Sequence, residues 1–73
     1  MALMHYPTLL RALRRARELT QEQLAQEIGV SFSTVNVWEN GHRRPQPFLA
    51  RRIVELARAA GVDPEEFRNA GSR

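Results

Sequence analysis

Helix-start signals recur along this chain and indicate where its helices begin. Thr20 and Gln23 have the spacing of a capping box, in which two side chains satisfy free backbone N–H groups at a helix start. A similar signal returns at Ser31, and again at Asp63, where Pro64 occupies the first helical position. Glycines stand where helices would end, and no alternating pattern predicts a strand. The sequence therefore predicts an all-α fold with five helices, near residues 8–18, 20–28, 31–40, 47–60 and 63–69.

Apolar residues at helical spacing predict one buried face on the first, second and fourth of these helices. We assign these positions to packing and give them no other role. They are Leu9, Leu10, Leu13, Ala16, Leu24, Ala25, Ile28, Leu49, Ile53, Leu56, Ala57 and Ala60.

The length and composition restrict how such a fold can be stabilised. The chain has 73 residues and no cysteine, which excludes disulfides and cysteine-based metal sites. His5 and His42 are too few and too far apart for a zinc site, so no metal or other cofactor is expected. We expect one domain over residues 8–69, with an N-terminal extension at 1–7 and a C-terminal tail at 70–73. With so few residues after the fourth predicted helix, no ligand-sensing domain is expected within these 73 residues.

The sequence does not suggest a membrane protein. No apolar run approaches the ~20 residues of a membrane span. The N-terminus has neither the basic lead nor the apolar stretch of a signal peptide. The expectation is a soluble cytoplasmic protein.

The positive charge is modest but unevenly distributed. The formal net charge is +3, and all eleven basic residues are arginine, with clusters within residues 11–17, 43–44 and 51–52. Arginine binds phosphate through paired hydrogen bonds that lysine cannot form, so the pattern suits nucleic acid. A GC-rich codon bias would also replace lysine with arginine, and the two interpretations carry equal weight.

The third predicted helix has two different faces. Val35 and Trp38, with Thr34, lie on one side and offer the larger apolar area, so this side should face the core. The opposite side carries no charge, two apolar side chains and small hydrogen-bonding groups, in the residues Phe32, Ser33, Asn36 and Val37. Asparagine can pair with adenine through two hydrogen bonds, and apolar groups can contact the thymine methyl. The alternative is that Phe32 folds back onto the domain and Val37 is an incidental exposed valine.

The segment TQEQLAQEIGVSFSTVNVWENG resembles the helix-turn-helix of the phage repressor and Cro family, also called the XRE family. The matching features are Ala25 at the helix crossing, Gly29 in the turn, Val35 and Trp38 beneath, and the closing WENG. The resemblance covers roughly residues 8–68. It implies a compact five-helix, lambda-repressor-like DNA-binding domain. In that family the first motif helix spans the DNA backbone and the second enters the major groove.

The resemblance also implies roles for individual residues. Gln21 would bind a phosphate, helped by the backbone amides at the start of its helix. Arg14 and Glu39 fall where the family has an internal salt bridge between the first and third helices. The remaining implied DNA contacts are Ser31, Phe32, Ser33, Asn36 and Val37 toward bases or flanking phosphates, and Asn40, Arg43 and Arg44 toward phosphates.

Two positions depart from the family pattern. Val37 stands where many relatives carry a polar or basic residue, which removes one hydrogen-bonding base reader. Glu18 stands where a glycine often ends the first helix, so that turn should be built differently.

The resemblance therefore predicts a sequence-specific double-stranded DNA-binding protein, a repressor-like transcriptional regulator that acts as a homodimer. The alternative is a protein-interaction module or an antitoxin-type adaptor with the same fold, because uncharged aromatic patches also mark protein contacts. An enzyme is not expected, since the sequence shows no nucleophile–base arrangement, glycine-rich phosphate loop or metal constellation.

Overall fold

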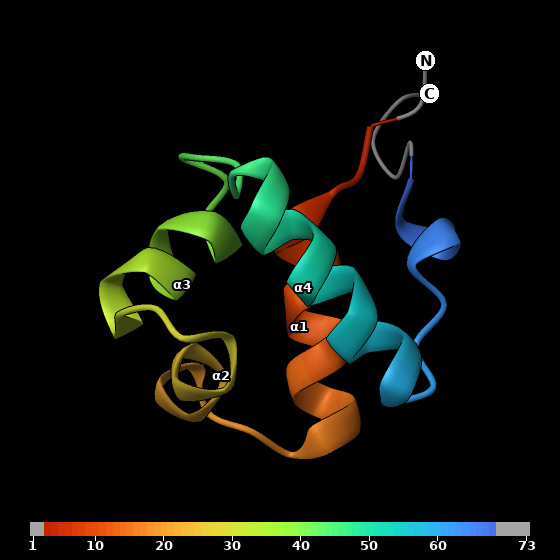
Figure 1. Ribbon diagram of the computed structural model, residues 1–73, viewed down its shortest axis with the longest axis horizontal. Helices are drawn as coiled ribbons and strands as arrows, with labels where there is room; N and C mark the ends of the chain where they lie inside the picture. The colour runs from red at the N-terminus through yellow and green to blue at the C-terminus, as the bar shows by residue number, and fades with distance from the viewer. Residues whose placement is uncertain (1–2, 69–73) are drawn as a thin grey trace.

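The computed structural model describes residues 3–68 of the chain. This part folds into four α-helices and one 3-10 turn (Figure 1). The predicted all-α fold is confirmed, and the helix starts predicted from Thr20 and Ser31 are confirmed to within a residue. The elements are α1 (Tyr6–Arg17), α2 (Gln21–Ile28), α3 (Phe32–Glu39), α4 (Pro47–Ala59) and the 3-10 turn η1 (Pro64–Phe67).

The prediction of a fifth α-helix near residues 63–69 is wrong. The segment forms only the turn η1, which Asp63 caps by accepting a hydrogen bond from the Glu65 N–H at 3.0 Å. Arg68 is already extended, because its backbone forms an isolated antiparallel bridge with Met4. This bridge takes the chain out of a helical path after one turn. Residue 69, the tail at 70–73 and residues 1–2 lie outside the described part of the chain.

The N-terminal segment packs against the end of η1. The His5 N–H donates a hydrogen bond to the Phe67 carbonyl at 2.8 Å, and α1 begins at Tyr6 rather than near residue 8. Met4 and Tyr6 are both buried. Residues that the sequence placed in an N-terminal extension thus contribute side chains to the core.

The core lies between α1, α2, α3 and α4. Leu9, Leu10 and Leu13 of α1 are fully buried, as are residues from the other helices. The predicted burial of Ala16 is wrong, because Ala16 is exposed. The chain turns back after α1 and packs Leu19 against the core at this end of the helix.

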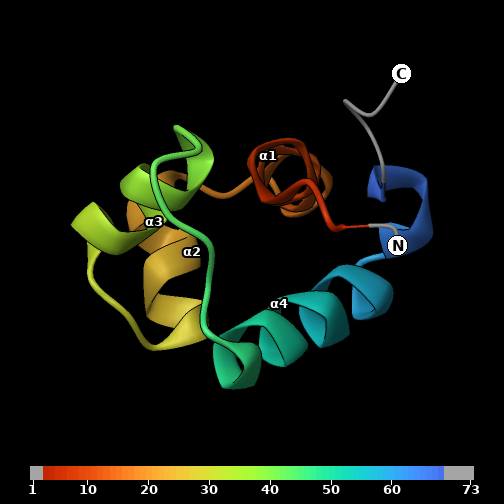
Figure 2. The same cartoon turned by 90° about the horizontal axis from the view of Figure 1, so that it is seen from above.

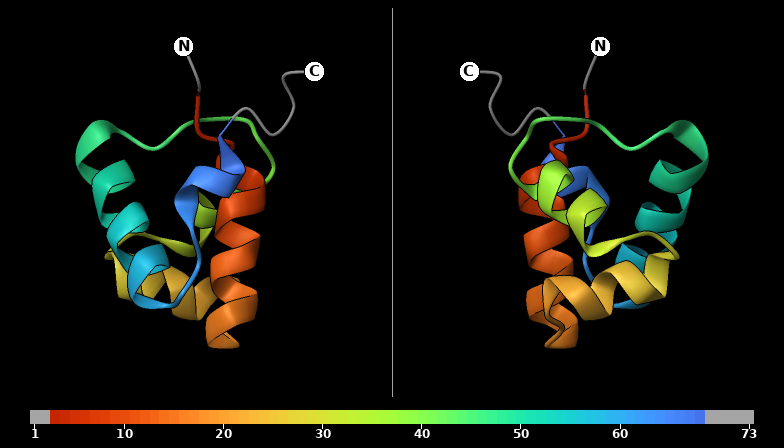
Figure 3. Two further views of the ribbon diagram at one scale, coloured as in Figure 1. Left: turned by 90° about the vertical axis from the view of Figure 1, so that its right-hand side faces the viewer. Right: turned by 90° about the vertical axis from the view of Figure 1, so that its left-hand side faces the viewer.

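The helices are arranged so that α2 and α3 lie together on one side of the molecule. The turn η1 lies on the opposite side in both perpendicular views (Figures 1 and 2). Figure 3 shows α2 lying across the C-terminal end of α1. In this arrangement Phe32 and Ser33 on the outer side of α3 are exposed.

The turn after α1 uses a left-handed residue that is not glycine. Glu18 has φ 56° and ψ 47°, and the N–H groups of Glu18 and Leu19 donate to the last turn of α1. A left-handed conformation costs a residue with a Cβ roughly 1–2 kcal/mol. The expectation that this turn is built differently is therefore wrong. The backbone of Glu18 has the left-handed conformation that glycine favours, and only the residue type departs from the family pattern.

We expect Glu18→Gly to raise the free energy of unfolding by about 0.5–1 kcal/mol. Glycine relieves the left-handed strain, and part of that gain is lost to the greater freedom of the unfolded chain. Denaturant unfolding measures the change. Gly61→Ala is the reverse control, because Gly61 has φ 81° and open space around its Cα, and it should destabilise by a similar amount. An unchanged or lowered stability for Glu18→Gly would contradict the argument.

Candidate nucleic-acid interface

The turn between α2 and α3 is built by local hydrogen bonds. At the start of α2, the Thr20 hydroxyl accepts from the Gln23 N–H at 3.0 Å and the Gln23 side chain accepts from the Thr20 N–H at 2.9 Å. Gly29 ends α2 with φ 95°. The Ser31 hydroxyl then caps α3 by accepting from the Thr34 N–H at 3.2 Å. These contacts fix the direction in which α3 leaves α2.

The rotation of α3 about its axis has the predicted sense. Val35 and Trp38 are buried, with 0% and 4% of their surface exposed. Phe32 is 49% exposed and Ser33 is also exposed. On the same outer side, Asn36 and Val37 are half-buried. The outer face of α3 is therefore uncharged, with one aromatic ring and small polar groups.

The ion pair expected between Arg14 and Glu39 is present and has two hydrogen bonds. Arg14 Nε donates to Glu39 Oε2 at 2.8 Å, and Arg14 Nη2 donates to Oε1 at 3.0 Å. Glu39 is 2% exposed, and the Arg14 side chain is 26% exposed. The pair joins α1 to the end of α3, so it holds α3 against the rest of the domain.

A second arginine at Glu39 was missed from the sequence. Arg11 Nη2 donates to the Glu39 backbone carbonyl at 2.8 Å, and Arg11 Nε lies 3.7 Å from Oε1. Arg11 is one helical turn before Arg14, so the i, i+3 spacing would have indicated that both guanidinium groups share one face of α1. Glu39 therefore faces two cations at the C-terminal end of α3, where an unpaired carboxylate would be unfavourable.

The surroundings of Glu39 keep it ionised. Burial alone would raise the pKa of this carboxyl group, but hydrogen bonds from Arg14 and Gln21 and the charges of Arg14 and Arg11 outweigh burial. The pKa of Glu39 is therefore below its ordinary value of 4.5. The hydrogen bond to Glu39 raises the pKa of Arg14 despite the opposing effect of burial. At neutral pH Glu39 is an anion that can only accept hydrogen bonds.

Three amide side chains continue from Glu39 toward the outer face, and we call Gln21, Asn36 and Asn40 the amide relay. Gln21 Nε2 donates to Glu39 Oε1 at 3.1 Å. Asn36 Nδ2 donates to Gln21 Oε1 at 3.1 Å, and Asn40 Nδ2 donates to Asn36 Oδ1 at 3.0 Å. Gln21 and Asn36 therefore have partners on both polar atoms, which the sequence did not predict.

The two arginines of the loop after α3 lie in different surroundings. Arg44 Nη1 donates to the Met4 carbonyl at 3.1 Å, and its guanidinium lies 5.1 Å from the centre of the Tyr6 ring. Arg43 is exposed, and no hydrogen bond or ion pair holds it within residues 3–68. The structure thus separates two residues to which the resemblance gave the same role.

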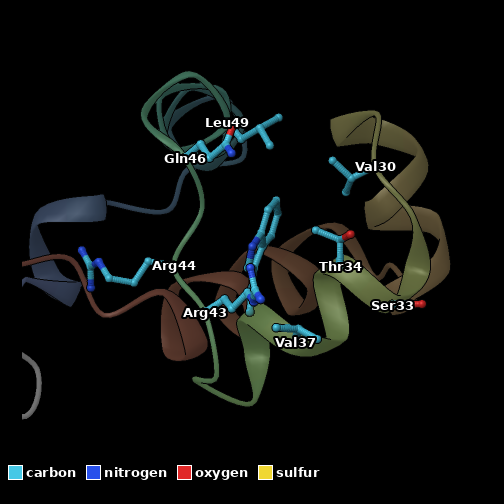
Figure 4. A pocket seen from close by; sticks show the side chains of 9 residues that line it. Val30, Ser33, Thr34, Val37, Arg43, Arg44, Gln46 and Leu49 are labelled. Carbon is cyan, nitrogen blue, oxygen red and sulfur yellow. The ribbon is translucent and has the colours of Figure 1, made fainter.

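An open groove of about 470 Å³ runs along α3, between this helix and the start of α4. The apolar residues that line it are Val30, Val37, Trp38 and Leu49. Arg43 also lines it, close to Val37 (Figure 4). Figure 4 shows the Arg44 side chain extending away from these apolar residues. The groove thus adjoins the outer face of α3, and Val37 belongs to both.

Two other kinds of site are absent from residues 3–68. No group of three or more potential ligand side chains could hold a metal ion in this part of the chain. None of its helices is both long enough and apolar enough to cross a membrane.

The chain is similar to known proteins over most of its length. The family model described as helix-turn-helix matches residues 10–67. An uncharacterised HTH-type transcriptional regulator of Bacillus subtilis strain 168, RghRB, is 41% identical over 84% of this chain and 52% of its own length. A second uncharacterised HTH-type transcriptional regulator, from Methanothermobacter thermautotrophicus, is 44% identical over 74% of each chain. A Rhodospirillum rubrum protein, described as an uncharacterised transcriptional regulator in the ATPase CF(0) region, is 36% identical over 86% of this chain and 56% of its own. The chain spans about half the length of the first of these relatives. No solved structure matches it.

Proposed function

The chain belongs to the helix-turn-helix family, and we propose that it forms the DNA-binding unit of a transcriptional regulator. In this proposal α3 enters the major groove of double-stranded DNA, and two copies bind a two-fold symmetric site. The observation that carries the proposal is the exposed outer face of α3, which offers Phe32 and Ser33 without any charged side chain. Such a surface can pack against base edges without burying a charged side chain that has no partner.

The proposed base contacts come from the outer face of α3. Ser33, Asn36 and Val37 would face base edges in the groove, with Phe32 as an apolar contact near the start of the helix. Ser31 is exposed at the N-cap, where its hydroxyl already accepts a backbone hydrogen bond, so a flanking phosphate is its proposed partner.

The proposed phosphate contacts surround that face. Gln21 retains one amide hydrogen for a phosphate at the start of α2, where the free backbone N–H groups also favour an anion. Asn40 and Arg43 would contact the phosphates at the other end of α3. Arg44 is the weaker candidate, because the Met4 carbonyl and the Tyr6 ring already engage its guanidinium.

The test compares single arginine variants for duplex binding at several salt concentrations. We expect Arg43→Ala to weaken all duplexes similarly and to reduce the slope of log affinity against log salt by about 0.9, the value for one lost phosphate contact. Arg44→Ala should change the slope less. Arg58→Ala is the matched control, because Arg58 is an exposed arginine near the end of α4.

Two results would contradict this assignment. An unchanged salt slope in Arg43→Ala would remove Arg43 from the interface. Affinity that does not depend on salt in the unmodified protein would contradict DNA binding altogether, because phosphate neutralisation releases counterions.

The homodimer is proposed from the symmetry of repressor sites. A helix-turn-helix dimer places its two recognition helices about one DNA turn apart, so the half-sites should be inverted and about 34 Å between centres. Selection of bound duplexes from a random pool would show such paired half-sites. A single half-site in the selected sequences would contradict the dimer.

One observation favours a second candidate, a protein-interaction module with the same fold. Phe48 at the start of α4 is 77% exposed, and Phe32 is 49% exposed on α3. Exposed aromatic side chains are enriched at the centres of protein interfaces. This candidate predicts that Phe48→Ser weakens capture of a protein partner, whereas the DNA-binding proposal predicts salt-dependent duplex binding.

A further inference from the structure

The amide relay runs from a buried carboxylate to the outer face of α3, and its polarity follows from the charge of that carboxylate. Glu39 is 2% exposed and bound by Arg14 through both oxygens, so Gln21 must direct its NH₂ group toward it. The Gln21 oxygen then points to Asn36 and can only accept. Asn36 must therefore donate to Gln21 and turn its own oxygen toward Asn40.

This polarity limits what Asn36 can offer to a base. One of its two amide hydrogens bonds Gln21, and its Oδ1 accepts from Asn40 at 3.0 Å. A bidentate contact to adenine needs one amide hydrogen and an available oxygen, since adenine offers an N7 acceptor and an N6–H₂ donor. The relay leaves the hydrogen free but occupies one of the two lone pairs of the oxygen, so the N6–H₂ group of adenine must share this oxygen with Asn40.

We propose that the amide relay makes Asn36 read bases mainly as a donor, so that it favours both purines over cytosine and discriminates only weakly between adenine and guanine. This inference rests on the proposed function. Both purines present N7 as an acceptor in the major groove, whereas cytosine presents only its N4–H₂ donor. Asn40 is a specificity-determining residue that touches no base in this scheme and acts by holding the oxygen of Asn36. In this proposal the relay weakens the adenine contact that the sequence suggested for Asn36.

The experiment first locates the base pair that Asn36 reads. Duplexes selected from a random pool by the full chain define the site, and the position at which Asn36→Ala loses discrimination identifies the pair. Affinities are then measured for duplexes with adenine, guanine or cytosine at that position. For the unmodified protein we expect adenine and guanine to agree within about twofold and cytosine to bind at least about fivefold more weakly, the lower end of one hydrogen-bonded contact.

The decisive variant is Asn40→Ala, which frees the oxygen of Asn36. It should bind more weakly overall and shift the ratio of adenine to guanine affinity about five- to tenfold toward adenine, the gain expected from the second hydrogen bond. Arg43→Ala is the matched control, because it should weaken binding through a lost phosphate contact and leave that ratio unchanged. A purely structural or electrostatic role of Asn40 would not change the ratio.

The outcomes separate the inference from the proposed function. An adenine preference above about fivefold in the unmodified protein would overturn the inference while leaving DNA binding intact. An unchanged ratio in Asn40→Ala would overturn it in the same way. If no duplex is selected at all, the proposed function fails and the inference fails with it.

Discussion

Glu39→Ala should lower the free energy of unfolding by about 3–5 kcal/mol, the effect expected when one partner of a buried ion pair is removed. The substitution leaves the Arg14 guanidinium without its two charge-assisted hydrogen bonds. It also removes the acceptor of Gln21 and leaves Arg11 without the nearby carboxylate. For a domain of this size the loss is a large part of the total stability. Denaturant unfolding monitored by circular dichroism measures it.

Glu27→Ala is the matched control for this substitution. Glu27 pairs with Arg17 at 3.3 Å, but both side chains are 37% exposed, so the same change should cost less than about 1 kcal/mol. Equal costs at the two positions would contradict the importance of burial at Glu39.

The contribution of Glu39 should also depend on pH in a defined direction. The pKa of Glu39 is lowered in the folded state, so the unfolded chain binds this proton more readily than the folded one. The stabilisation is therefore complete above the ordinary pKa of 4.5 and is lost as the pH falls through the lower, folded value. The difference in stability between the unmodified protein and Glu39→Gln should shrink as the pH falls below about 4.5. A difference that stays constant or grows over that range would contradict the assignment.

Short-range signals in the sequence predicted the helix-turn-helix well. The capping interactions of Thr20 and Ser31 involve residues three positions away, so their spacing alone specifies the geometry. The faces of α3 followed from helical periodicity, because Trp38 and Val35 offer more apolar area than the residues opposite them, and both are buried. The Arg14–Glu39 pair came from the family resemblance, since no local rule joins residues 25 positions apart.

The sequence predicted less well wherever a distant contact decides the conformation. Asp63 and Pro64 correctly indicated a helix start, but pairing of Arg68 with Met4 ends the segment after one turn. The roles of Arg43 and Arg44 look identical in sequence. Their surroundings differ because Arg44 donates to the Met4 carbonyl and lies over the Tyr6 ring, whereas Arg43 has no such contact within residues 3–68.

The amide relay depends on contacts between distant residues even more than the end of η1 or the surroundings of Arg44 do. It requires side chains from α2 and α3 to meet within hydrogen-bond distance beside the charge of Glu39. Periodicity places Asn36 on the outer side of α3 but cannot show which of its atoms is already engaged. The sequence therefore indicated which side of α3 faces outward, but not which polar atoms on that side are already hydrogen-bonded.

Ser33→Glu should weaken duplex binding at least about 100-fold without loss of folding. Ser33 is exposed on the outer face of α3, so the new carboxylate would lie against bases and phosphates if this face enters the major groove. Placing a negative charge against a negative surface costs several kcal/mol, and about 1.4 kcal/mol corresponds to each tenfold loss of affinity. Ser33 is also the second residue of α3, where the positive end of the helix dipole favours a glutamate. The stability of the free protein should therefore stay within about 0.5 kcal/mol of the unmodified value or rise slightly.

The matched control is Ala59→Glu, which adds the same charge at an exposed position. Ala59 is the last residue of α4, and Figure 2 shows that end of α4 on the opposite side of the molecule from α3. Ala59→Glu changes the net charge equally but introduces no carboxylate at the proposed interface. We expect it to weaken binding less than about tenfold, through the long-range field alone, and this difference should shrink at high salt. Equal losses in the two variants would mean that net charge controls binding. A Ser33→Glu protein that folds and binds duplex normally would exclude the outer face of α3 as the DNA-binding surface.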